Sequence, residues 1–519
     1  MDKDRAKTFV FSPWNLVVFG LAFMTPVAPI LIYGDLLHRS GGAPSLSYII
    51  AFVVILFTAQ SYSKLSRVCS GPAYIYVRSG LSKYAGIFVG LGSLLLYIVA
   101  AASAFRVGAL FASDIVPETP RFGWILLFTA VSGSVTLLGA RATAIANSVF
   151  LYLTTAIVAV YVLVCAFAAD RGTGVGEIIS IVPLNSNADL DAFATGIGLA
   201  CLSFIGFDSI TAVSDASRNP KKNASRAMIV ACFLAACLFF LQTYASGLII
   251  PDYTGLPASA DAFFSVSNKA GGPPMVYLCT AAIILAAFCV GIAGQTAAYK
   301  VLLAIRRNET LFRSIDTPRL LKDRPAARNA IPAIIAILLT FSAAAAIDLP
   351  ATTFFSVAQF CGCLCFVLVN ATVMIRFYFR KKRRRHIVTG LIFPVIGFFS
   401  SLYLWVDTEP ICFGIMFAAT LAAGLIILCP DIVGAIKERR KRIALRNDED
   451  NSESSGTRAN EANKGVSMIR PAIIIERIKR MASGALKRKT EDDEYANATY
   501  KLKSSAKRVL KGRRNRARK

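Results

Sequence analysis

GLACLSFIGFDSITAVSDASRNPKKNASRA, the stretch from Gly198 to Ala227, begins as an apolar run typical of a membrane span and ends in a basic loop. Its middle combines Gly206 with small polar side chains and the carboxylate of Asp208. Glycine allows a helix to open, and an opened helix exposes backbone N–H and C=O groups to a ligand. Free backbone groups at membrane depth occur only where they line a cavity or are buried in protein. The stretch therefore predicts a transporter with a broken helix at its centre.

The composition of the whole chain is that of a polytopic membrane protein. Of its 519 residues, 55% are hydrophobic and 17% are charged. An average soluble domain has about 25% charged residues. The mean hydropathy is +0.56, and many apolar runs reach the roughly 20 residues that cross a bilayer. The first run follows basic residues, as in a signal peptide, but it has no small-residue cleavage site, so we expect a retained helix.

Twelve apolar runs are predicted to be membrane spans, which makes the predicted fold an all-α integral membrane protein. The runs are Pro13–Leu37, Leu46–Ser63, Gly86–Ala112, Gly123–Gly139, Thr143–Ala168, Leu190–Asp215, Met228–Ile250, Pro274–Ile305, Ile331–Ile347, Thr352–Ile375, Ile387–Trp405 and Ile411–Cys429. The predicted organisation is an N-terminal tail (1–12), five spans (13–168), five further spans (190–379), a final pair (387–430) and a basic C-terminal tail (436–519).

Positive charge follows the loops between these runs. The net charge is +26, and Lys and Arg gather in alternate loops, whereas the opposite loops contain only Arg39, Arg121, Arg171 and Lys269. The positive-inside rule explains this alternation. We therefore expect a multi-pass protein of the plasma membrane with both termini in the cytoplasm, and we do not expect nucleic acid as a partner.

Catalytic and metal-binding patterns are not found in the sequence. No segment outside the predicted spans is long enough for a soluble catalytic domain, and no nucleophile–base pair or phosphate loop is present. Cys361, Cys363 and Cys365 alternate, so on a helix they point in different directions and do not converge on a metal. We expect no enzymatic activity, no metal and no cofactor.

The C-terminal tail, residues 436–519, is polar and strongly basic, and we expect most of it to be disordered. Within it, Pro471–Lys489 has apolar residues at helical spacing with basic residues around them. One interpretation is a helix that lies on an anionic lipid surface. The other is a solvated basic tail.

The first predicted span contains a second candidate break. Pro26 and Pro29 each remove a backbone donor, so the helix should open near Thr25 to Ala28. The first and sixth spans are five apart, which is where an inverted five-plus-five repeat places its paired broken helices. Opened half-helices direct positive N-termini at an anion and carbonyls at a cation, so a zwitterionic amino acid fits. The alternative is an ordinary kink at the prolines and a packing contact at Gly206.

Two charged residues within the predicted spans are candidates for direct roles. Asp208 is expected to hold a substrate ammonium or a proton, or simply to cap the second half-helix. Arg106, in the third span, is a candidate charge partner for a substrate carboxylate or for Asp208. It also has the length to extend outward to the membrane surface.

With these residues in view, the chain resembles permeases of the amino acid–polyamine–organocation (APC) superfamily, and its loops are most similar to those of putrescine-importer-like members. The resemblance extends from Trp14 to about Pro430. The segments that carry it are Phe23–Gly34, Tyr62–Leu65 with Ser70–Arg78, Ser203–Asp208 with Asn219–Asn223, and Lys300–Arg307.

The resemblance implies a LeuT-like fold, alternating access, and uptake coupled to an ion, which is a proton (H⁺) or a sodium ion (Na⁺). It implies that the substrate binds where the first and sixth spans break. By the same resemblance, the substrate-binding residues are Thr25, Pro26, Val27, Ala28, Ser203, Phe204, Gly206, Phe207 and Asp208.

Several positions depart from the family pattern and affect the expected substrate. Leu96 is apolar where polyamine importers of this type tend to have a carboxylate, and Arg106 adds a positive charge nearby. A dication would be repelled there, so we favour amino acids as substrates over putrescine-like polyamines. A third hypothesis is a membrane receptor or scaffold that acts through the basic tail. In that case deletion of the tail, and not mutation of Gly206, should abolish function.

Overall fold

The computed structural model describes residues 11–308, 325–346, 351–379 and 387–406, together with Thr408, Cys412 and Gly414. The predicted span Ile411–Cys429 and the C-terminal tail with Pro471–Lys489 lie outside these residues, apart from Cys412 and Gly414. Every regular element in the described part of the chain is helical, in agreement with the predicted all-α class.

The helices follow one another along the chain as the apolar runs predict. Their bounds are α1 (Pro13–Met24), α2 (Ala28–Arg39), α3 (Pro44–Ser66), α4 (Ala73–Gly80), α5 (Lys83–Ile115), α6 (Arg121–Leu138), α7 (Ala140–Asp170), α8 (Leu190–Leu202), α9 (Ser209–Val213), α10 (Pro220–Ile249), α11 (Asp261–Asn308), α13 (Pro325–Ala345), α14 (Ala351–Val373) and α15 (Phe393–Val406). Short helical turns at Val182–Leu184, Ser214–Ala216, Met374–Phe379 and Val388–Ile392 complete the described elements.

Eight of the described helices are long and apolar enough to cross a membrane, or nine if α1 and α2 form one bent span. Two shorter apolar helices, Leu190–Leu202 and Ala330–Ala345, coincide with further predicted spans. The chain is therefore a multi-pass membrane protein, while the count of twelve spans stays a prediction.

The eighth predicted span starts at a break inside α11. The apolar run begins at Pro274, but α11 begins at Asp261 and continues through a kink at Gly272, where φ is 68°. Two glycines and two prolines, residues 271–274, mark a turn in sequence. The structure interrupts the helix there, because Gly272 adopts non-helical dihedral angles (φ 68°, ψ −169°) that other residues disfavour.

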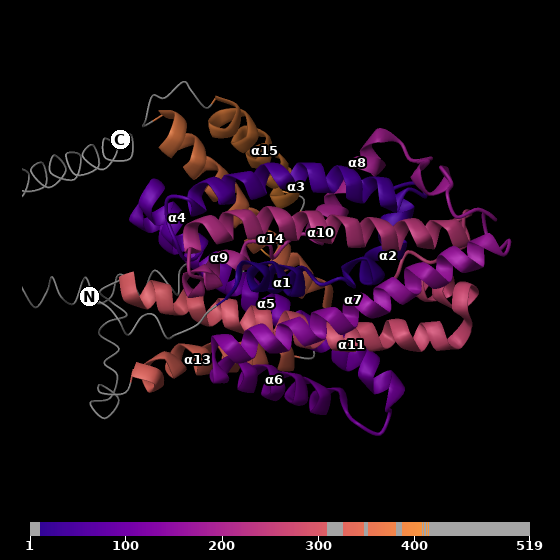
Figure 1. Cartoon of the computed structure of the whole chain (residues 1–519), viewed down its shortest axis with the longest axis horizontal. Coiled ribbons are helices and arrows are strands. Elements are labelled where there is room, and N and C mark those ends of the chain that lie inside the picture. The colour runs from indigo at the N-terminus through magenta and orange to yellow at the C-terminus, as the bar shows by residue number, and fades with distance from the viewer. Residues whose placement is uncertain are drawn as a thin grey trace, which may run out of the picture. The chain divides into compact units, whose positions relative to one another are not determined.

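The helices pack into a bundle around α1 and α9 (Figure 1). On one side α3 and α10 run together, and on the other α11 packs along both α5 and α7. Large apolar side chains such as Leu138, Phe167 and Leu338 are exposed on the outward faces of α6, α7 and α13. Such faces are stable in lipid, which solvates apolar side chains.

Four helix ends meet at one end of the bundle. Phe11, just before α1, forms a β-bridge with Ser217, and Gly71 N–H donates to Ser214 Oγ (3.3 Å). Ser63 of α3 and Ser225 of α10 are joined through their hydroxyls at 2.7 Å. The starts of α1 and α10 therefore lie beside the ends of α3 and α9, as the alternation of basic loops requires. We call this the basic end.

Candidate functional site

The first span is interrupted where its two prolines predict. Helix α1 ends at Met24 and α2 begins at Ala28, with a 50° bend between them. Thr25 has a φ of 51°, a left-handed conformation that is uncommon for a residue other than glycine. Pro26 has no backbone N–H to continue the helix. The span is therefore opened into two half-helices and not merely kinked.

The sixth span opens around Gly206. Helix α8 ends at Leu202 and α9 begins at Ser209, and Gly206 between them has a φ of 119°. A Cβ at Gly206 would lie 2.1 Å from Cδ1 of Phe23. Glycine is required here both by its backbone conformation and by the ring packed against it. Since Phe23 belongs to α1, the two breaks are in contact.

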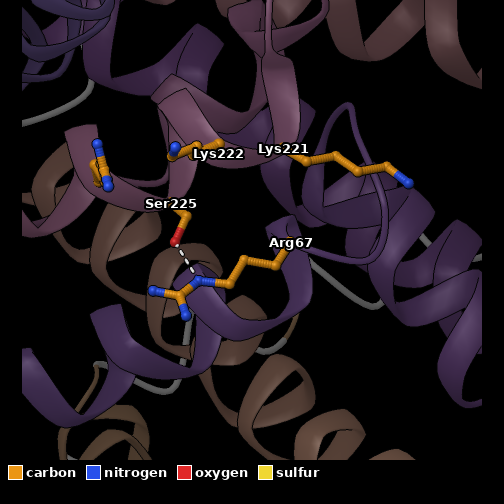
Figure 2. A pocket seen from close by; sticks show the side chains of 5 residues that line it. Arg67, Lys221, Lys222 and Ser225 are labelled. Carbon is orange, nitrogen blue, oxygen red and sulfur yellow. Dashed lines mark hydrogen bonds between the residues drawn. The ribbon is translucent and has the colours of Figure 1, made fainter. Parts of the chain in front are cut away.

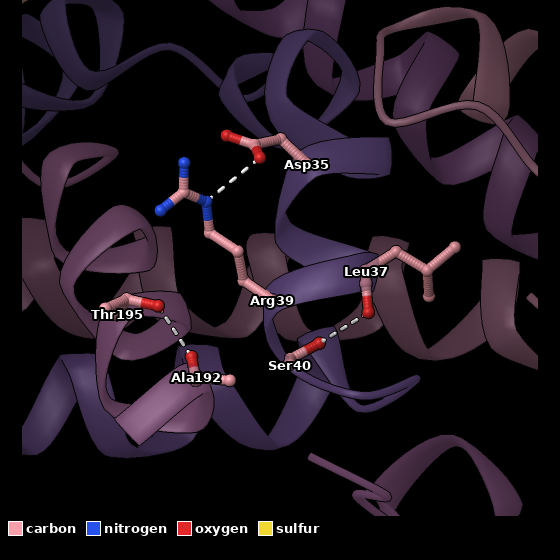
Figure 3. Close-up of polar contacts among 6 residues, drawn as sticks. All are labelled: Asp35, Leu37, Arg39, Ser40, Ala192 and Thr195. Carbon is pink, nitrogen blue, oxygen red and sulfur yellow. Dashed lines mark hydrogen bonds and ion pairs between the residues drawn. The ribbon is translucent and has the colours of Figure 1, made fainter. Parts of the chain in front are cut away.

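The half-helices also pair on either side of the breaks. Helix α2 packs on α8, and α1 packs on α9. Figure 3 shows residues of the first pair, namely Leu37 and Ser40 at the end of α2, and Ala192 and Thr195 of α8. A Cβ at Gly196 of α8 would lie 3.3 Å from the backbone nitrogen of Ser40. Two broken spans thus run side by side through the centre of the bundle.

Asp208 is a buried carboxylate beside the two helix breaks, and we call the place where the breaks meet the junction. Its side chain is fully buried, and Oδ2 accepts a hydrogen bond of 2.7 Å from the hydroxyl of Tyr97 on α5. Oδ1 has no hydrogen-bond partner among the described residues. Asp208 stands at the N-cap position of α9, yet its side chain makes no capping bond. The capping role is therefore not seen, and the roles of ammonium or proton acceptor remain.

Other buried polar atoms near the breaks also lack partners within the described part of the chain. They are the hydroxyl oxygens of Thr25, Tyr62, Ser209 and Thr211. Buried polar groups are normally hydrogen-bonded, so unsatisfied ones call for an explanation, and a bound ligand, ion or water is one. The hydroxyl of Ser203, in contrast, pairs with that of Tyr48 on α3 at 3.0 Å.

Aromatic rings enclose the junction. Phe23 meets Tyr97 edge to face with centroids 5.5 Å apart, and Phe207 contacts Tyr62 at 5.4 Å. Phe204 packs against Phe239 of α10 at 5.3 Å. Phe204 and Phe207 are fully buried, so they form apolar walls beside the polar groups.

Helix α10 holds the first-span break through Gln242. Its Nε2 donates a 3.3 Å hydrogen bond to the carbonyl oxygen of Pro26, and its Oε1 has no partner in the described residues. Gln242 is fully buried. The carbonyl of Pro26 is freed by the break, so this contact satisfies a group that the interrupted helix leaves open.

Arg106 lies away from this junction. Its Nη1 donates to the carbonyl oxygen of Ala346, and its guanidinium carbon is 4.7 Å from the centroid of the Phe354 ring. Tyr97 and Arg106 are nine residues apart on α5, or about 13 Å along the helix axis. The hypothesised pair between Arg106 and Asp208 is not formed.

Three residues that the sequence did not indicate as site residues belong to the junction, namely Tyr97, Tyr62 and Gln242. Each is a polar side chain inside an apolar predicted span. Polar residues in spans are commonly directed at the interior or at a site. That pattern was available in the sequence, but it did not indicate which of the many polar residues meet.

The sequence profile described as "Amino acid permease" matches residues 15–431. The low-affinity putrescine importer PlaP of Escherichia coli is 26% identical over 439 residues, 82% of this chain and 93% of that protein. Cationic amino acid transporter 4 of Homo sapiens is 26% identical over 286 residues, 50% of this chain and 44% of that protein. Branched-chain amino acid permease BcaP of Lactococcus lactis is 22% identical over 268 residues, 47% of this chain and 56% of that protein.

The paired breaks inside a multi-pass helical bundle, together with these relatives, define a membrane transporter and not an enzyme. The chain belongs to the amino acid permease family, because the match covers nearly all of its predicted spans. The expected resemblance to the amino acid–polyamine–organocation superfamily is thereby confirmed.

Proposed function

We propose that the chain is a secondary active transporter that moves amino acids across the plasma membrane by alternating access, coupled to a proton or a sodium ion. The observation that supports this most directly is the contact between two helix breaks beside the buried carboxylate of Asp208. The framework is a LeuT-like arrangement of twelve spans, with repeats at 13–168 and 190–379 and both termini in the cytoplasm.

The substrate carboxylate is proposed to bind at the break from Thr25 to Ala28. Helix α2 starts at Ala28, so its N-terminus directs a positive dipole at this point. The buried hydroxyl of Thr25 adds a donor that has no partner among the described residues. Backbone and hydroxyl donors at a helix start are a general anion-binding arrangement.

The substrate ammonium is proposed to bind Asp208. Its Oδ1 is available as an acceptor, while Tyr97 holds Oδ2 and fixes the orientation of the carboxylate. The apolar part of the substrate then contacts Phe204 and Phe207, with Ser203 and Gly206 completing the sixth-span wall. A buried carboxylate that neutralises an ammonium is far more stable than either charge alone.

Alternating access is proposed to use the same breaks as hinges. Half-helices joined by non-helical residues reorient without breaking further hydrogen bonds. The pair α2 and α8 and the pair α1 and α9 would then tilt in turn. When no substrate is bound, Asp208 is also the group placed to take a proton, which would link proton movement to transport.

A putrescine-like polyamine is the second candidate substrate. Arg106 contacts Ala346 and Phe354 and lies nine residues along α5 from Tyr97, the residue that binds Asp208, so the charge objection to a dication is weaker than the sequence indicated. The similarity to the E. coli putrescine importer also favours it. The objection to a polyamine is that a dication needs two counter-charges. Among the described residues, Asp208 is the one carboxylate at the junction.

The test is uptake of a labelled amino acid mixture into proteoliposomes, with unlabelled amino acids and putrescine as competitors. Competition by neutral amino acids alone supports the proposal, and competition by putrescine alone overturns it in favour of the second candidate. Preloaded unlabelled substrate should accelerate uptake if access alternates. Collapsing the proton or the sodium gradient separately identifies the coupling ion, and no effect of either contradicts ion coupling.

A further inference from the structure

A cavity of about 380 Å³ lies where α3 ends and α10 begins, at the basic end of the bundle. Its lining residues are Arg67, Lys221, Lys222, Ser225 and Arg226, and Figure 2 shows it. Four of the five are cations, contributed by segments about 150 residues apart in the sequence. The volume exceeds the roughly 30 Å³ that one water occupies in the liquid, so a polyatomic group fits.

These cations have no carboxylate partner in the part of the chain that the structure describes. An ion pair within the described ranges joins Asp35 and Arg39 (2.9 Å), but it lies in another part of the structure. Lys221, Lys222 and Arg226 are exposed and form no described ion pair. Four like charges around one cavity repel one another, so an anion bound among them would gain from all four.

At the base of the cavity an exposed arginine is held by a buried serine. Ser225 is almost fully buried, and its hydroxyl oxygen accepts a 2.9 Å hydrogen bond from Nε of Arg67. The hydroxyl of Ser63 lies 2.7 Å from the same oxygen. This contact uses only one nitrogen of the guanidinium. In Figure 2, no dashed line joins its two remaining nitrogens to the residues drawn. Arg67 is thereby oriented with its planar pair of donors available.

We propose that this cavity binds the phosphate group of an anionic phospholipid headgroup. Paired guanidinium donors match phosphate oxygens, and lysines add point charge. Helix α10 is 30 residues long, and its first turn contains Lys221 and Lys222, so the helix dipole adds to the positive field.

The position in the fold favours a lipid as the source of this phosphate. Helices α3 and α10 are both candidate membrane spans, ending at Ser66 and starting at Pro220. The ends of spans lie at the level of the lipid headgroups, and the cytoplasmic leaflet is the more anionic one. The cavity does not belong to the junction of the two breaks, so the proposal does not depend on the proposed substrate site; it shares with the proposed function only the predicted cytoplasmic orientation of this end.

The proposal is tested by thermal unfolding of the purified full chain in detergent. Dioctanoyl phosphatidic acid is compared with dioctanoyl phosphatidylcholine, glycerol 3-phosphate and inorganic phosphate. We expect a dose-dependent rise of the unfolding temperature with phosphatidic acid and little with the other three. Arg67→Gln should weaken the apparent affinity roughly tenfold or more, since it removes charge-assisted hydrogen bonds.

Arg141→Gln, a basic residue at the start of α7 that does not line the cavity, is the matched control and should respond like the unaltered protein. If Arg67→Gln fails to fold, Lys222→Gln replaces it, because Lys222 is exposed and its loss leaves no buried group unpaired. Equal stabilisation by inorganic phosphate would overturn the lipid as the source. Equal losses in Arg67→Gln and Arg141→Gln, or no response to any phosphate compound, would overturn the site.

Discussion

Asp208 combines two properties that rarely occur together in a membrane span. It is fully buried, and one of its carboxylate oxygens has no hydrogen-bond partner in the described structure. Burying an unpaired charge is costly. A buried carboxylate of this kind is therefore expected where a ligand supplies a hydrogen-bond donor or a proton neutralises its charge. Tyr97 supplies one donor, and the proposed substrate ammonium supplies the rest.

Asp208→Asn tests this role, because it keeps the size of the side chain and removes its charge. A hydrogen bond to a charged group contributes about 1.5–3 kcal/mol, which corresponds to a roughly ten- to hundredfold change in affinity. We therefore expect KM for an amine-bearing substrate to rise by that factor in proteoliposomes. Asp114→Asn, at the exposed end of α5, should leave KM unchanged. An unaltered KM in Asp208→Asn would exclude direct recognition by this carboxylate.

Gly206→Ala should lower both transport and thermal stability. The left-handed conformation costs a non-glycine residue about 1–2 kcal/mol, and the new Cβ would lie 2.1 Å from the Phe23 ring. A bulkier residue such as leucine therefore acts on folding as well as on opening of the helix. Gly255→Ala, which meets no atom within 4 Å, is the control. Wild-type uptake and unfolding temperature in Gly206→Ala would contradict the described contact.

At the scale of helices, the important feature is that the two broken spans are paired on both sides of their breaks. The halves α2 and α8 pack together, as do the halves α1 and α9. Each half is too short to cross a bilayer alone, so its stability depends on its partner, and α1, α2 and α9 also pack on α10. Such pairing couples the two breaks, because a tilt of one half displaces its neighbour.

Gln242→Leu tests the link between α10 and the first-span break. It leaves the carbonyl of Pro26 without its 3.3 Å donor, and an unsatisfied buried acceptor costs about 1–3 kcal/mol. We expect a several-fold slower uptake together with a lower unfolding temperature. The neighbouring Thr243→Val is the matched control, since the Thr243 hydroxyl bonds within its own helix to Phe239 (2.8 Å). If the two variants have the same uptake rate, Gln242 of α10 does not stabilise the break in the first span.

At the scale of the whole molecule, the helix ends gather at two opposite ends of the bundle. The starts of α1 and α10 lie beside the ends of α3 and α9. The opposite end joins Gly41 with Asn187 (2.9 Å) and His38 with Leu256 (2.7 Å). This arrangement agrees with a chain that crosses the membrane back and forth, and the basic loops then predict which end is cytoplasmic.

An epitope inserted at Gly176 should be labelled by antibody on intact cells, whereas an N-terminal epitope should require permeabilised cells. Gly176 is exposed, and a Cβ placed on it would meet no described atom within 4 Å, so the space for an insertion is open. Preserved uptake is the control for folding. Labelling of the N-terminal epitope on intact cells would reverse the predicted orientation.

The sequence by itself determined the all-helical membrane class, nearly every described helix and the positions of both breaks. These are local properties, because apolar runs, proline and glycine act through the residues next to them in the chain. The same local pattern placed the start of the eighth span at Pro274, directly after the break inside α11 at Gly272. The sequence also predicted membership in a transporter family, which the comparisons confirm.

Only the tertiary structure decided which side chains meet. Tyr97 and Asp208, Phe23 and Gly206, and Arg67 and Ser225 are pairs of residues far apart in the chain. Arg106 was a reasonable candidate partner for Asp208, yet it contacts Ala346 and Phe354. Such contacts depend on how helices rotate and pack against one another. Packing is set by the whole interior at once, so no local pattern contains it.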